Sequence, residues 1–104
     1  MVTNAEVQRM YHHFNKKYFG NRLPKDMIVD FNRAKDYHGR TAFYKTRPLH
    51  IQIGWHLRDS NAHVALTLLH EMVHVELPAR FNHGPRFHKR MLKLAKQGAM
   101  KPWW

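Results

Sequence analysis

The chemistry of this chain centres on the motif His70-Glu71-x-x-His74. If the segment is helical, the two histidines lie one turn apart on the same face, where two imidazoles can share one metal ion. Glu71 then lies about 100° further round the helix, close enough to contact a water on that ion without being a ligand. The pattern predicts a metal-assisted hydrolase in which Glu71 is the catalytic base.

The flanking residues predict that the motif is helical. From Asn61 to Leu77, apolar side chains recur at steps of three and four residues, which is the period of a half-buried helix. Residues 59–61 all favour the N-cap position, and Pro78 ends the helix soon after the motif. Two ordinary surface histidines are the simpler alternative, but the motif and its helical context agree.

A third ligand is required, because a catalytic zinc site usually has three protein ligands and an open position for water. Glu76 points away from the two histidines, and His63 lies two turns, or about 10 Å, before the motif. The loop residue His83 can turn toward the motif, and His88 in the next helix is its main competitor. Spacing leaves three further histidines open, namely His38, His50 and His56.

The remaining segments must position the site, and their pattern predicts an α+β fold. A capping box at Thr3 and apolar residues at helical spacing predict a helix over 4–19. Alternating apolar residues predict three short strands, at 27–31, 40–45 and 49–54. Pro85 begins a last helix, which Gly98 ends. Because brief turns separate the strands and parallel pairing needs long crossovers, we expect an antiparallel meander.

The composition fits one small domain of 104 residues, with residues 99–104 as a short tail. The absence of cysteine excludes disulfides, cysteine-ligated zinc sites and thiol catalysis. No apolar run is long enough to span a membrane, and the first residues lack the pattern of a signal peptide. We therefore expect a soluble, cytoplasmic monomer that is neither secreted nor bound to a membrane.

The net charge of +11 is uneven, since no acidic residue follows Glu76. Such asymmetry predicts a polyanionic partner, most simply DNA, although a basic surface without a ligand is the alternative. The candidate phosphate contacts are the basic residues of the last helix, Arg86, Lys89, Arg90, Lys93 and Lys96. Trp103 and Trp104 could stack on bases or pack against the core.

The His70-Glu71-x-x-His74 motif and the segment from His83 to Phe87 together resemble the SprT-like zinc metallopeptidase domain, which includes the Spartan proteases of DNA–protein crosslinks. The run from Phe14 to Pro24 also resembles the opening helix and loop of that family. The resemblance implies a zincin-like fold in a minimal form, without the cysteine-bearing zinc ribbon of many relatives. It also implies that His83, in a His-Gly-x-x-Phe segment, is the third ligand of Zn2+.

The activity that this resemblance implies is zinc-dependent hydrolysis of peptide bonds, in proteins bound to or crosslinked on DNA. Zinc would lower the pKa of its water toward 7, and Glu71 would move the proton to the leaving amine. Zincin-like proteases commonly hold the substrate along an edge strand, for which residues 49–55 are the candidate. The alternatives are, in order, a zinc-containing nucleic-acid-binding module with little or no hydrolytic activity and a metal-dependent nuclease.

Overall fold

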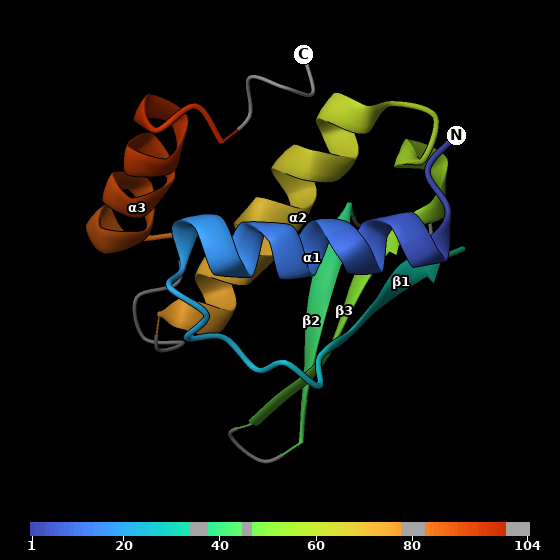
Figure 1. The fold of residues 1–104 in the computed structure, drawn as a ribbon, viewed down its shortest axis with the longest axis horizontal. Helices are drawn as coiled ribbons and strands as arrows, with labels where there is room; N and C mark the ends of the chain where they lie inside the picture. Colours follow the sequence, from blue (N-terminus) through green and yellow to red (C-terminus); the bar gives the residue numbers. More distant parts are fainter. Residues whose placement is uncertain (34–37, 45–46, 78–82, 100–104) are drawn as a thin grey trace.

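A computed structural model describes residues 1–33, 38–44, 47–77 and 83–99. Their elements are, in chain order, α1 (Asn4–Tyr18), β1 (Ile28–Asn32), β2 (Gly39–Tyr44), β3 (Arg47–Gly54), the 3-10 helix η1 (Trp55–Leu57), α2 (Asn61–Glu76) and α3 (Pro85–Lys96). Helix α1 crosses the sheet and packs on β1, whereas α2 packs on β2 and β3, and α3 packs against α2 (Figure 1). The predicted α+β class is therefore confirmed.

Helix α1 begins where the capping box predicts. The Thr3 hydroxyl accepts a hydrogen bond from the Glu6 backbone N–H at 3.1 Å, and the Glu6 carboxylate accepts one from the Thr3 N–H at 3.3 Å. At the other end, buried Asn15 exchanges two hydrogen bonds of 3.1 Å with the backbone of Leu23. These bonds fix the loop that leads into β1, so α1 and the sheet have a defined relative position.

The sheet is mixed, with strand order β1-β3-β2, so the prediction of a purely antiparallel meander is wrong. Strand β1 pairs with β3 in parallel, with Val29 opposite Ile51, and β2 pairs with β3 antiparallel, with Thr41 opposite the same residue. A parallel connection needs about a dozen residues or more. The segment between β1 and β3 is long enough because it contains β2.

This order corrects two further expectations. Strand β3 lies between its two neighbours, so residues 49–55 do not form an edge along which a substrate could extend. The predicted start of the third strand at residue 49 is two residues late, because β3 begins at Arg47. Pro48 is tolerated there because β1 starts pairing only at His50, which leaves Pro48 beside β2 alone.

Helix α2 carries the centre of the core. It begins after Ser60, whose hydroxyl accepts the N–H of His63 at 3.4 Å, and ends at Glu76. Its fully buried residues are Val64, Ala65, Leu68, Leu69, Met72 and Val73. Full burial of a valine, leucine or methionine side chain contributes about 1.5–3 kcal/mol, so this face holds α2 firmly and fixes the direction of its opposite face. Of the helices described, none has the length and apolar character needed to cross a membrane.

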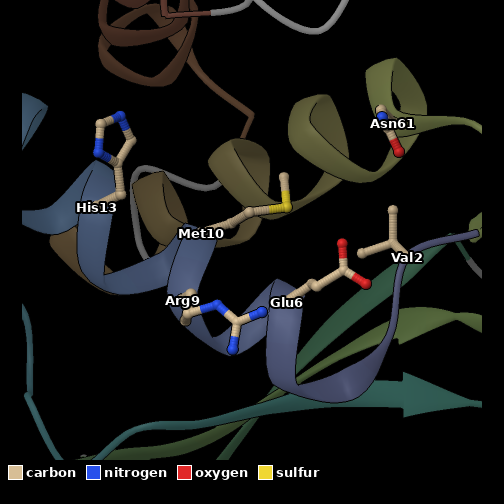
Figure 2. Close-up of a pocket in the computed structure, with 6 residues that line it drawn as sticks. All are labelled: Val2, Glu6, Arg9, Met10, His13 and Asn61. Carbon is tan, nitrogen blue, oxygen red and sulfur yellow. The ribbon is translucent and has the colours of Figure 1, made fainter.

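A hollow of about 300 Å³ lies between α1 and the start of α2. Its floor is Val2 and Met10, and Figure 2 shows these apolar side chains between α1 and Asn61 of α2. Glu6, Arg9 and His13 complete the lining. Glu6 is the one carboxylate in this lining, and it is engaged in the capping box of α1. The hollow therefore offers no carboxylate that is available for acid–base chemistry, and the candidate site lies elsewhere among the described residues.

Candidate metal centre

His70, His74 and His83 converge in the structure. Their Nε2 atoms lie 3.1 Å apart in each of the three pairs, and their ring centroids are separated by 4.8 to 5.1 Å. We call these three residues the histidine cluster. Within the part of the chain that the structure describes, it is the one group of three or more side chains that could hold a metal ion.

The positions of the three imidazoles follow from local structure. His70 and His74 are one turn apart on the same, partly buried face of α2, as the helical period requires. His83 precedes α3 and has a φ of 52°, in the left-handed region that residues other than glycine rarely adopt. Gly84 is the N-cap of α3 and Pro85 its first residue. The unusual backbone angle returns the chain from α2 into α3 with the third imidazole facing the other two.

The other candidate histidines lie outside the cluster. His88 is exposed on α3 and contacts the ring of Phe87 at 6.2 Å between centroids. His50 pairs with Asp30 across the sheet at 2.7 Å, and the rings of His38 and His56 lie 5.7 Å apart on the surface. His63 lies in the first turn of α2. Of the alternatives that spacing left open, only His83 therefore joins the motif.

Phe87 forms an apolar wall behind the histidine cluster. Its ring centroid lies 4.8 Å from that of His70, 4.6 Å from His74 and 5.1 Å from His83, and the residue is 4% exposed. Contact with one rigid ring limits the orientations open to all three imidazoles. It also excludes water from one side of the site, which strengthens electrostatic interactions there.

The surroundings disfavour the charged forms of His70 and His74. Burial, reinforced by the neighbouring His74 and His83, lowers the pKa of His70 from 6.5 to about 4. Burial also lowers the pKa of His74, with a smaller contribution from His83. Metal ions bind the neutral form of imidazole, so the lowered pKa of His70 and of His74 favours the form that can bind a metal.

The geometry and donor type fit zinc. Zinc binds imidazole nitrogen at about 2.0–2.1 Å, so three nitrogens around one tetrahedral ion are separated by about 3.4 Å, or slightly less when the angles are compressed. The observed separations of 3.1 Å agree with such a site. Three imidazoles without a carboxylate also favour zinc or another transition metal over magnesium or calcium.

Glu71 lies beside the cluster without belonging to it. Its side chain is 8% exposed, and Oε2 lies 4.0 Å from Nε2 of His70. Its other oxygen, Oε1, accepts a hydrogen bond of 2.9 Å from the hydroxyl of Thr41 on β2. Burial raises the pKa of Glu71, and the hydrogen bond from Thr41 opposes that rise. A carboxylate with a raised pKa at this place can accept a proton from a group that lies beside the histidine cluster.

A comparison with family models identifies the chain. The model of the SprT-like family matches residues 7–102, nearly the whole sequence. The chain belongs to the SprT-like family. This result confirms the resemblance inferred from the two histidine motifs, and family membership suggests a zinc-metallopeptidase-like domain. A comparison with curated proteins gives no match.

The five basic residues of α3 that were predicted to contact phosphate in this SprT-like chain fall into two groups. Arg86, Lys89, Lys93 and Lys96 are exposed on α3. Arg90, predicted to contact phosphate, is turned inward, where it donates to the Glu76 carboxylate and to the Tyr18 carbonyl, each at 2.7 Å. Trp103 and Trp104 lie outside the described residues.

Two contacts of the site were absent from the sequence interpretation. One is the hydrogen bond from Thr41 to Glu71, which joins residues 30 positions apart. The other is the wall formed by Phe87, which was noted only as part of the His-Gly-x-x-Phe segment. The alternation of β2 places Thr41 on the same side as Gly39, but only the packing of α2 on β2 reveals that this side faces the motif.

Proposed function

We propose that this SprT-like chain is a zinc-dependent metallopeptidase, with zinc held by His70, His74 and His83 and with Glu71 as the general base. The observation that carries the proposal is the convergence of three Nε2 atoms at 3.1 Å beside a buried carboxylate. A hydrolase of the His-Glu-x-x-His type requires this combination of ligands and base.

The residues divide the work of hydrolysis between them. When bound, zinc acts as a Lewis acid that lowers the pKa of water and polarises the scissile carbonyl. Glu71 takes the proton from the attacking water and delivers it to the leaving amine, so that one carboxylate serves as base and then as acid. The wall formed by Phe87 shields this proton transfer from bulk water on one side.

Strand β2 is the preferred partner for an extended peptide substrate. Among the strands that the structure describes, β2 is at an edge of the sheet, and edge strands can pair with an added strand. It also lies close to the base, because a Cβ built on Gly39 would be 3.3 Å from Cγ of Glu71. A peptide paired along β2 would therefore run beside the catalytic carboxylate.

The exposed basic face of α3 supports a nucleic-acid-bound substrate, such as a protein crosslinked to DNA. Lys89, Lys93 and Lys96 are exposed there, and lysine side chains bind phosphates with a sequence-independent, salt-sensitive affinity. Because α3 also carries Phe87 at the metal centre, DNA held on this helix would lie close to the site of hydrolysis.

The test combines a chelator with a variant of the base. The zinc-loaded chain is incubated with a DNA-binding protein and DNA, with and without chelator, and Glu71→Gln is assayed in parallel. We expect cleavage that the chelator abolishes, and a loss of about 10²- to 10⁴-fold in Glu71→Gln at unchanged zinc content, because an amide cannot accept the proton. Zinc binding without cleavage would favour a binding module, and nicked DNA would favour a nuclease.

A further inference from the structure

The carboxylate of Glu71 is held asymmetrically by Thr41. The Thr41 hydroxyl donates to Oε1 at 2.9 Å, whereas Oε2 lies 4.0 Å from Nε2 of His70, on the side of the histidine cluster. One carboxylate oxygen is thereby committed to the strand, and the other faces the place where a nucleophile would stand.

Among the described residues, Thr41 is the one side chain that donates a hydrogen bond to this carboxylate. The last torsion of a glutamate side chain is broad and does not fix the plane of the carboxylate by itself. Since the group is 8% exposed, few water molecules can orient it either. The hydroxyl of Thr41 is therefore the contact that sets which oxygen faces the metal centre.

The position of Thr41 is itself fixed by the close approach of β2 to α2. Thr41 pairs with Ile51 in the sheet, and two residues earlier Gly39 lies directly against α2. A Cβ on Gly39 would be 2.6 Å from Cγ2 of Thr67, so only glycine allows this approach. Residues 39 and 41 face the same side of the strand, and the short strand-to-helix distance brings the Thr41 hydroxyl within reach of Glu71.

We propose that Thr41 is a positioning residue, which orients the general base of the hydrolysis by holding Oε1 of Glu71 and leaving Oε2 directed toward the attacking water. This inference rests on the proposed peptidase function. It assigns Thr41 no contact with metal or substrate, so its removal changes the rate of the chemical step while zinc content and substrate binding stay the same.

The kinetic test uses Thr41→Val, which keeps the shape of the side chain and suits a strand, and Thr41→Ser, which restores the hydroxyl. On a peptide substrate we expect kcat of Thr41→Val to fall about 10- to 100-fold, with KM within about twofold and one zinc per chain. Thr41→Ser should recover most of kcat. Thr67→Val is the matched control, because it removes a hydroxyl from the same helix–strand contact and keeps the methyl group near Gly39.

A second readout does not depend on activity. The chain contains three glutamates, Glu6, Glu71 and Glu76, so 13C labelling of their carboxyl carbons gives three NMR signals, which Glu6→Gln and Glu71→Gln assign. We expect Thr41→Val to shift the Glu71 signal alone, and Thr41→Ser and Thr67→Val to leave it in place.

An unshifted Glu71 signal or an unchanged kcat in Thr41→Val would overturn the inference, as would a Thr41→Ser variant as slow as Thr41→Val. If the zinc-loaded wild-type chain cleaves no peptide, the proposed function fails. The NMR shift then still decides whether Thr41 orients Glu71.

Discussion

Helix α2 carries two polar clusters near its C-terminal end, and they are built on opposite principles. The histidine cluster joins α2 to the start of α3 through three like groups. The second cluster, which we call the ion-pair cluster, consists of Arg22, Glu76 and Arg90 and joins the same two helices through opposite charges. The two clusters lie within one turn of each other along α2.

In the ion-pair cluster, both arginines find their partner within the cluster. Glu76 accepts from Nε of Arg90 at 2.7 Å and from Nη2 of Arg22 at 2.9 Å, so each charge meets its opposite. In the histidine cluster, burial and like neighbours lower the pKa of His70 and His74, and the three nitrogens face one another. A cluster in which each cation contacts a carboxylate indicates a structural role, whereas converging imidazoles without an opposite charge indicate a site for a ligand.

The largest expected effect that separates the two clusters is a loss of zinc affinity when the histidine cluster is broken. His83→Ala should lower zinc affinity by more than about 100-fold, because even groups that only support a ligand contribute 10- to 100-fold. Competition with a chromophoric chelator measures the affinity. His88→Ala is the matched control, since His88 contacts the same Phe87 ring but lies outside the cluster. Full zinc occupancy in His83→Ala would show that the third ligand is another residue.

Breaking the ion-pair cluster should affect stability and leave metal binding intact. Glu76→Gln leaves Arg90, whose side chain is 13% exposed, without its opposite charge, and we expect a loss of about 1–3 kcal/mol. This corresponds to a fall in Tm of about 5–15 °C for a small domain. Arg22→Ala should cost less than about 1 kcal/mol, since Arg22 is 68% exposed. Equal losses in the two variants, or loss of zinc in Glu76→Gln, would remove the distinction between the clusters.

The smallest effect concerns pH. Because the pKa of His70 is about 4 in the folded, metal-free chain and 6.5 ordinarily, the unfolded chain binds the proton more readily between these values. Stability should therefore be complete above pH 6.5 and fall as the pH decreases toward 4. His70 is about one-third exposed, so we expect a loss of about 1–2 kcal/mol after solvent screening.

Urea unfolding of the chelator-treated chain at pH 7 and pH 5 measures this difference in the free energy of unfolding, and His70→Gln should reduce the difference. An equal pH dependence in His70→Gln would assign the effect to other groups.

The sequence predicted those parts of the site that depend on local periodicity. The spacing of His70 and His74 and the apolar face of α2 follow from the turn of one helix. Local geometry favoured His83 over His88 as the third ligand, because a loop residue can turn toward the motif, but spacing left other histidines open and only the family resemblance implied His83 specifically. The pairing of β1 with β3 was missed, since it depends on how segments distant in the chain meet.

Arg90 illustrates why charge patterns are weaker predictors than apolar periodicity. It belongs to a run of basic residues on α3, and the sequence offers no sign that it differs from Lys89 or Lys93. In the structure Arg90 lies over the ring of Phe19 at 4.7 Å and bonds to Glu76. The position of a long, flexible basic side chain depends on its tertiary partner, and that partner cannot be identified until the packing of the helices is known.

The left-handed backbone conformation of His83 determines which substitutions at that position would stabilise the fold. In the metal-free chain, a glycine at that position would relieve strain of about 1 kcal/mol at the φ of 52°. The same replacement removes an imidazole, so the zinc-loaded chain would lose the stability that a bound metal adds. A screen for heat resistance without zinc should therefore select His83→Gly, whereas the same screen with zinc should retain the histidine.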